Sequence, residues 1–255
     1  MPVPDDRERA GIAAWILRWW RALVAELIAT ALLVGLGVAT LMPVKGIHEI
    51  QLTHPALAFG FIVTGNAMIF GPASGAHMNP AVTLAAVVHG RMSALLALAY
   101  FVAQTAGALI GFGALLAMTP ANAAQAPHGC TAPGPNVSPL AAAAMEAVMT
   151  GLLALGCCAA WAAHDDARPD HTVPIKLGLL VAGLVYSGGF LSAASLNPVR
   201  SLAPAVFHSF WQSHWVYWVG PLGGAALAAA LHRFVLTERA PRRAAPEQLP
   251  LNDKP

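Results

Sequence analysis

Two asparagine–proline pairs stand inside apolar stretches of this sequence, Asn79-Pro80 and Asn197-Pro198. A buried asparagine amide must find hydrogen-bond partners. Asparagine is also a favoured N-cap of a helix, and proline fits the first helical turn because that turn does not need its N–H. Each pair is therefore expected to end an extended segment and to open a short helix, with the amide free to donate to a passing oxygen atom.

The backbone just before each pair would offer carbonyl oxygens as acceptors along the same path. Two helix N-termini that meet in one place create a positive region, which opposes cations, including hydronium. This combination of donors and acceptors suits a neutral molecule with hydroxyl groups and suits an ion poorly. The residues expected to contribute these carbonyls are Gly75, Ala76, His77, Met78, Ser192, Ala193, Ala194 and Ser195.

The composition places these segments in a membrane protein. Of the 255 residues, 57% are hydrophobic and only 10% are charged, whereas soluble domains carry about 25% charged residues. Apolar stretches of roughly 20 residues are long enough to cross a bilayer as helices. The two stretches that begin with Asn-Pro, 79–88 and 197–208, are too short and are expected to be re-entrant half-helices. The predicted spans are 20–41, 52–70, 93–118, 139–161, 174–191 and 214–236.

Basic residues predict the orientation, because short cytoplasmic loops carry an excess of lysine and arginine. An arrangement of six spans with both termini in the cytoplasm places all but two of these residues on the cytoplasmic side. The exceptions are Lys45 and Arg200. The loop around 119–138 is then external, and it has no lysine or arginine but contains a glycosylation sequon at Asn136. The cytoplasmic residues are Arg7, Arg9, Arg18, Arg21, Arg91, Arg168, Lys176, Arg233, Arg239, Arg242, Arg243 and Lys254.

The two halves of the chain resemble each other. "SGAHMNPAVTLA" matches "SAASLNPVRSLA" at an offset of 118, "AELIAT" matches "MEAVMT" at 120, and "YFVAQTAGA" matches "YWVGPLGGA" at 117. Each half holds three spans, so the second half crosses the membrane in the opposite sense. An inverted repeat of this kind is typical of transport proteins, with the site near the midplane between the halves.

The residues quoted so far resemble the aquaporin, or major intrinsic protein, family. The resemblance also rests on "NPVRSLAPAVF", "HWVYWVGPLGG" and the paired helix glutamates Glu26 and Glu146, and the C-terminal half is most similar to insect members. It implies an all-α membrane fold of six transmembrane helices and two re-entrant half-helices, one pore per subunit, and usually four subunits in the plasma membrane. The implied organisation is a tail over 1–18, a channel domain over 19–236 with repeats 19–118 and 139–236, and a tail over 237–255.

The resemblance also implies a narrow selectivity filter near the outer side, built from Phe59, Val185, Ala194 and Arg200. Water-selective members typically carry histidine at the second position and cysteine at the third. Valine and alanine make this filter wider and more apolar, with Arg200 as its one strong donor, which is the character of glycerol and urea channels. The absence of a thiol at Ala194 predicts weak inhibition by mercury.

Other positions favour the alternative of a water-selective channel: Ser201, Ala205, Tyr217 and Trp218 match the water-type pattern. Val199 also departs from the usual Asn-Pro-Ala, which stands complete at Asn79, Pro80 and Ala81. A further alternative is a mainly structural or adhesive membrane protein with little conduction.

Buried acids in spans default to a functional hypothesis, but the repeat symmetry of Glu26 and Glu146 favours a structural role in holding the half-helices. The spans contain no nucleophile–base pair, so an enzyme is not expected. The three cysteines make no disulfide framework, and the histidines show no metal-ligand spacing. We therefore expect no cofactor, no metal and no nucleic-acid partner. The expected partners are the lipid bilayer, water and small neutral solutes such as glycerol and urea.

Overall fold

The computed structural model describes residues 6–43, 51–120, 127–165 and 167–237. Within these ranges the chain is helical, with six helices long and apolar enough to cross a membrane and two short ones, as the sequence predicted. The predicted C-terminal tail after residue 237 lies outside the described part. The helices are α1 (Asp6–Ala39), α2 (Thr53–Ser74), α3 (Pro80–His89), α4 (Ala94–Met118), α6 (Pro139–Ala163), α7 (Val173–Ser192), α8 (Pro198–His208) and α9 (Val216–Leu231), with a π-helical turn, η1 (His232–Leu236).

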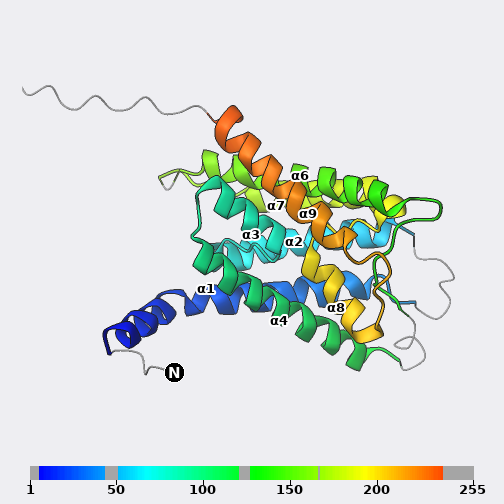
Figure 1. Cartoon of the computed structure of the whole chain (residues 1–255), viewed down its shortest axis with the longest axis horizontal. Helices are drawn as coiled ribbons and strands as arrows, with labels where there is room; N and C mark the ends of the chain where they lie inside the picture. Colours follow the sequence, from blue (N-terminus) through cyan, green and yellow to red (C-terminus); the bar gives the residue numbers. More distant parts are fainter. Residues whose placement is uncertain (1–5, 44–50, 121–126, 166, 238–255) are drawn as a thin grey trace, which may run out of the picture.

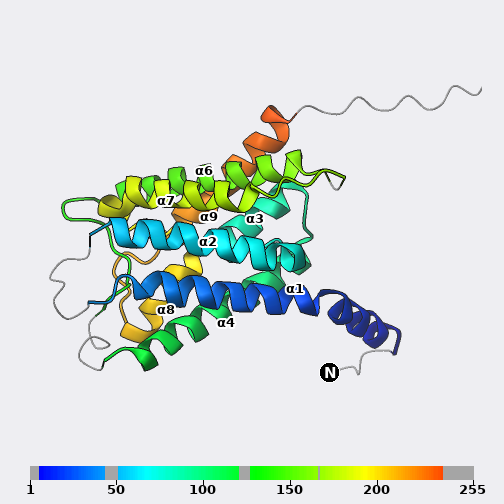
Figure 2. The same cartoon turned by 180° about the vertical axis from the view of Figure 1, so that it is seen from behind.

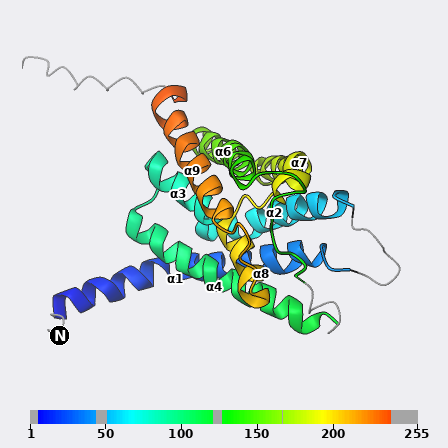
Figure 3. The ribbon, with the colours of Figure 1, turned by 45° about the vertical axis from the view of Figure 1, so that its right-hand side comes forward.

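The long helices form one bundle, in which α1 packs on α4, α6 packs on α9, and α2 packs on α7 across the two halves. Figure 2 shows α2 between α1 and α7. The start of α1 and the end of η1 lie at the same end of the bundle (Figure 1). The short helices α3 and α8 extend from the middle toward opposite ends (Figure 3), as an inverted repeat requires.

Small residues allow the paired helices to approach closely. A Cβ atom on Gly111 of α4 would overlap the carbonyl oxygen of Ala31 on α1, and one on Gly224 of α9 would overlap the carbonyl oxygen of Ala147 on α6. Close backbone approach through small residues is how helices pack in membranes, where lipid tails are as apolar as the side chains. The outward faces carry large apolar side chains, such as Phe190 and Leu227, which are 76% and 75% exposed. The chain is therefore a multi-pass integral membrane protein.

Two helix ends differ from the sequence prediction. The first span was expected to start near residue 20, but α1 begins at Asp6, within the segment predicted as a tail. Arg18 and Arg21 lie over the rings of Trp19 and Trp20, at 4.9 and 5.4 Å from the ring centroids. Both contacts join sequence neighbours within α1, close to where the apolar stretch begins.

The sixth span was expected to run over 214–236, and its last turn is π-helical. Arg233 in this turn donates to the carbonyl oxygen of Val88, at 2.7 Å, near the end of α3. Thr237 closes the turn by donating from its backbone N–H and its hydroxyl to the carbonyl of His232. The bond from Arg233 joins this helix end to a residue 145 positions away, a contact that no local pattern encodes.

Candidate pore and selectivity filter

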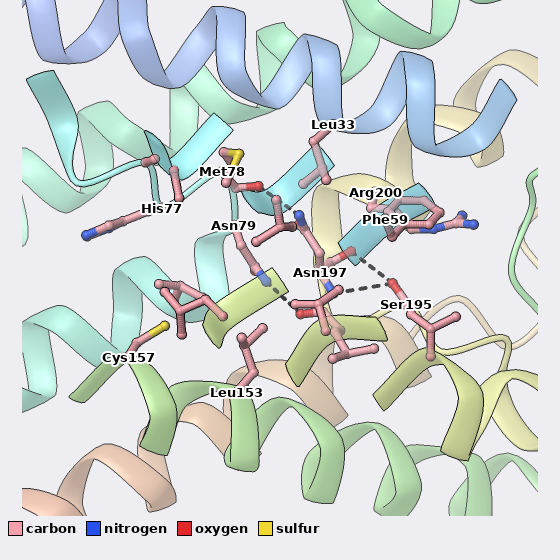
Figure 4. A pocket seen from close by; sticks show the side chains of 18 of the residues that line it. Leu33, Phe59, His77, Met78, Asn79, Leu153, Cys157, Ser195, Asn197 and Arg200 are labelled. Carbon is pink, nitrogen blue, oxygen red and sulfur yellow. Dashed lines mark hydrogen bonds between the residues drawn. The ribbon is translucent and has the colours of Figure 1, made fainter. Parts of the chain in front are cut away.

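The two asparagines meet at the centre of the molecule and hold each other's loops (Figure 4). The Oδ1 atom of Asn79 accepts from the N–H of Ala81 at 2.8 Å, and that of Asn197 accepts from the N–H of Val199 at 3.1 Å, so each caps its short helix. The Nδ2 group of Asn79 donates to the carbonyl of Leu196 at 2.7 Å, and that of Asn197 donates to the carbonyl of Met78 at 2.8 Å. An amide carries two hydrogens, so each asparagine keeps a second one for another acceptor.

The proline after each asparagine occupies the first helical turn, as expected. Pro80 opens α3 and Pro198 opens α8. Ala81 and Val199 are fully buried, and neither belongs to the described linings of the cavities at this site. Their backbone N–H groups are used by the capping asparagines, so they contribute to the site through the main chain.

The backbone before each asparagine adopts a conformation that side chains other than glycine rarely take. In the first re-entrant loop, residues 75–79, Ala76 and Met78 have φ values of 49° and 53°. In the second re-entrant loop, residues 193–197, Ala193, Ala194 and Leu196 have φ values of 68°, 44° and 56°. Each such residue costs about 1–3 kcal/mol and persists only where surrounding contacts enforce it.

The two buried glutamates supply those contacts in the same way in each half. Glu26 accepts from the backbone N–H groups of His77 and Met78, at 2.8 Å each, and from the hydroxyl of Ser74 at 2.7 Å. These bonds hold two backbone N–H groups of the first loop. Glu26 also accepts from the amide of Gln104 at 2.8 Å.

In the second half, Glu146 accepts from the N–H groups of Ser195 and Leu196, at 2.8 Å each, and from the hydroxyl of Ser192 at 2.7 Å. Both glutamates are completely buried. The described donors to Glu146 lie at the end of α7 and in the second loop. The geometry supports the structural role proposed from the repeat symmetry.

Two cavities lie next to each other between the two halves of the chain. The central one, of about 100 Å³, is lined by both re-entrant loops and both asparagines. The outer one, of about 360 Å³, is lined by residues 127–130 and the ends of α2 and α7. Among the described residues, four line both cavities, and they are the four positions of the predicted filter: Phe59, Val185, Ala194 and Arg200.

The guanidinium group of Arg200 is fixed at this junction. Its Nη1 donates to the carbonyl of Gly129 at 2.5 Å, and its Cζ lies 5.5 Å from the centroid of the Phe59 ring. Arg200 is 4% exposed. Because a guanidinium has five N–H donors, those not used by Gly129 are available to an oxygen atom in the cavity. Among the described lining residues, Val185 and Ala194 add apolar side chains at the same level.

In the second half, the residues that line the cavities are shifted by one position from the sequence prediction. Ser192 is the last residue of α7, its hydroxyl is used by Glu146, and the described linings of both cavities omit it. Leu196, which was not predicted, lines the central cavity and is equivalent to Met78. The repeat offset of 118 between the asparagines pairs 78 with 196 and could have identified it.

Thiols also line the cavities, which sequence reasoning missed. Cys157 on α6 lies in the wall of the central cavity (Figure 4), and Cys130 lies in the wall of the outer one. Burial raises the pKa of the Cys130 thiol to about 11. The expectation of weak mercury inhibition considered only position 194, and these two thiols remove its basis. A helical projection of α6 against Glu146 could have placed Cys157, which lies three turns along the same helix.

The sequence comparisons agree with this geometry. The family described as "Major intrinsic protein" matches residues 14–232. The chain belongs to the major intrinsic protein family. Members of this family are membrane channels and not enzymes, so this major intrinsic protein is assigned to the membrane channels.

Several relatives of this major intrinsic protein cover most of its length. The lens fiber major intrinsic protein of Gallus gallus is 38% identical over 87% of this chain and 84% of its own length. Aquaporin-5 of Sus scrofa is 37% identical, over 86% and 82%. Aquaporin-4 of Mus musculus is 34% identical, over 87% and 69%.

A solved structure shares the fold. The X-ray structure of the aquaglyceroporin from Plasmodium falciparum superposes with a TM-score of 0.74 at 21% identity, covering 86% of this chain and 97% of that one. At this identity the likeness establishes the fold alone. Which solute the chain conducts has to be inferred from the filter residues. The similarity to insect members stays a prediction.

Proposed function

We propose that this chain is a passive channel that conducts water and small uncharged solutes such as glycerol and urea while excluding protons and ions. The observation that carries the proposal is the junction of the two cavities. There, one guanidinium faces the apolar side chains of Phe59, Val185 and Ala194. A polyol can place its hydroxyl groups on the donors and its carbon atoms on the apolar wall.

Exclusion of ions is supported by the centre of the site. The N-termini of α3 and α8 meet at the two asparagines, and the positive ends of their dipoles oppose a cation. A water molecule or hydroxyl group that arrives there can accept from the second hydrogen of each asparagine amide. It can donate to backbone carbonyls of the re-entrant loops, whose residues line the central cavity.

The alternative, a water-selective channel, is favoured by the buried Ser201, Ala205 and Tyr217 and by relatives named aquaporins. We infer further that the channel is a homotetramer of the plasma membrane with both termini in the cytoplasm. The start of α1 and the end of η1 lie at the same end of the bundle, which supports placing both termini on one side of the membrane (Figure 1). A mainly structural or adhesive protein would leave the cavities without a use.

Stopped-flow light scattering on proteoliposomes tests the proposal. A sucrose gradient should give water efflux faster than in protein-free liposomes, and glycerol and urea gradients should give re-swelling. Water flux without re-swelling would favour the water-selective alternative. No water flux above the protein-free rate would refute conduction.

The filter assignment is tested by Val185→His, which adds bulk and a polar ring at the junction. We expect this variant to lower glycerol permeability more than water permeability. Leu179→His is a matched control, because Leu179 lies on the same helix but is 61% exposed to the membrane side. Equal losses of both permeabilities in Val185→His would contradict the assignment.

A further inference from the structure

A chain of buried hydroxyl groups joins the outer loop to the central cavity. The hydroxyl of Thr131 donates to Oγ of Ser201 at 2.8 Å, and Oγ of Ser201 lies 2.5 Å from Oγ of Ser195. The hydroxyl of Ser195 donates to the carbonyl of Asn197 at 2.9 Å. Thr131 is 3% exposed and Ser201 is completely buried. Three hydroxyls thus connect the loop before α6 with the second re-entrant loop.

The carbonyl at the end fixes the direction of this chain. A carbonyl oxygen only accepts, so Ser195 must give its single hydrogen to Asn197. Ser201 must then give its hydrogen to Ser195, and Thr131 gives its own to Ser201. In this direction each of the three hydroxyls donates once, and the carbonyl of Asn197 also accepts from the N–H of Ser201 at 3.3 Å. Removal of the Thr131 hydroxyl therefore removes the donor at the start of an ordered network.

The loop that carries Thr131 also holds the filter arginine. Gly129, two residues earlier, accepts from Nη1 of Arg200 at 2.5 Å. Gly129 has φ of 80°, a left-handed conformation that favours glycine, and a Cβ atom there would overlap the side chain of Val38. Gly134, three residues after Thr131, donates to the carbonyl of Leu191 at 2.9 Å. The loop is thus held by the side chain of Thr131 and, on either side of it, by backbone contacts at Gly129 and Gly134.

We infer that Thr131 is a positioning residue of the selectivity filter, which acts by fixing the Gly129 carbonyl and through it the guanidinium of Arg200. This inference rests on the proposed function of Arg200 as the donor of the filter. The guanidinium lies against Phe59 and Gly129, and the open space beside it is the junction of the two cavities. A guanidinium released from Gly129 therefore moves into the path of the solute.

The expected effect of Thr131→Val is a lower glycerol-to-water permeability ratio. Valine keeps the shape of threonine and removes only the hydroxyl. A hydrogen bond of ordinary net strength changes the population of the held conformation about two-fold or more. Since glycerol is larger than water, it is slowed more by an arginine that enters the path, so the ratio should fall by about two-fold or more.

The test measures both permeabilities in proteoliposomes for wild type, Thr131→Val, Thr131→Ser and Thr105→Val. Thr131→Ser restores the donor and should restore the ratio. Thr105→Val is the matched control, since the described partner of its hydroxyl is the carbonyl of Phe101 within α4, at 2.7 Å. An unchanged ratio in Thr131→Val, or an equal fall in Thr105→Val, would overturn the inference.

A double-mutant cycle separates an effect through the arginine from a general loosening of the loop. In an Arg200→Val background, Thr131→Val should leave the permeability ratio unchanged. A further fall in that background would show that Thr131 does not act through Arg200 and would refute the inference.

A readout without solute flux keeps this test independent of the proposed function. Nitrogen-15 solid-state NMR of the reconstituted protein reports the order of the guanidinium, with the Arg200 signal identified by its loss in Arg200→Val. Thr131→Val should reduce the order of that signal, and an unchanged signal would overturn the inference. If wild type fails to pass glycerol, the proposed solute range fails, and the NMR result still decides the role of Thr131.

Discussion

Replacing Glu146 with glutamine tests how the second re-entrant loop is held. The substitution keeps the size of the side chain and leaves one acceptor oxygen in place of two. Glu146 accepts from the backbone N–H groups of Ser195 and Leu196 through different oxygens. Whichever way the new amide turns, its NH₂ group faces one of these two N–H groups.

The expected cost follows from those bonds. A hydrogen bond to a charged group contributes about 1.5–3 kcal/mol, and a buried donor left without a partner costs about 1–3 kcal/mol. These two contributions overlap, so we expect Glu146→Gln to lower the free energy of unfolding by about 2–4 kcal/mol. For a chain of this size, that corresponds to a fall in the apparent melting temperature of about 4–16 °C.

The assay is thermal unfolding in detergent together with water flux in proteoliposomes. Thr150→Val is a matched control, because Thr150 lies one turn further along α6 and its buried hydroxyl has no described hydrogen-bond partner. This control should keep the wild-type melting temperature, and Glu26→Gln should behave like Glu146→Gln. A Glu146→Gln variant as stable as wild type would refute the reasoning.

Two further predictions concern the cavities and the helix contacts. Mercuric chloride should inhibit water flux, and the double substitution Cys130→Ser with Cys157→Ser should abolish that inhibition; Cys158→Ser, which alters a thiol that packs toward α9, should leave it intact. Gly111→Ala should lower the melting temperature because its Cβ would overlap a carbonyl oxygen of α1, whereas Gly183→Ala, with open space around its Cβ, should not; equal melting temperatures for the two alanine variants would contradict the packing argument.

The architecture was predictable because it depends on local features of the sequence, namely the lengths of the apolar stretches and the positions of the Asn-Pro pairs. Apolar stretches either reach across a bilayer or fall short of it, and the Asn-Pro pairs mark where the short ones begin. The repeat offset then relates Asn79 to Asn197 and Glu26 to Glu146 without any coordinates. The bond between each asparagine and the opposite carbonyl follows only once the halves are folded together.

Other features depended on contacts that leave no local pattern. Arg233 reaches the end of α3 from the far end of the chain, so no helix signal near residue 236 could indicate a π-turn. The loop that holds Thr131 and Gly129 has no periodicity, and its partners Ser201 and Arg200 lie some 70 residues away. The residues of the filter could therefore be proposed from the sequence, but the Gly129 carbonyl that holds its arginine could not.

The crossed bonds between the asparagines have a consequence for how such a chain could arise. Asn79 donates to Leu196 of the other half, and Asn197 donates to Met78, the equivalent position of the first. A half-chain that carries one asparagine and one such carbonyl has both members of the pair. Two copies of it, related by a twofold axis in the membrane plane, would form the same two bonds with each other. The centre of the channel is in this sense a symmetric dimer contact that a single polypeptide now encloses.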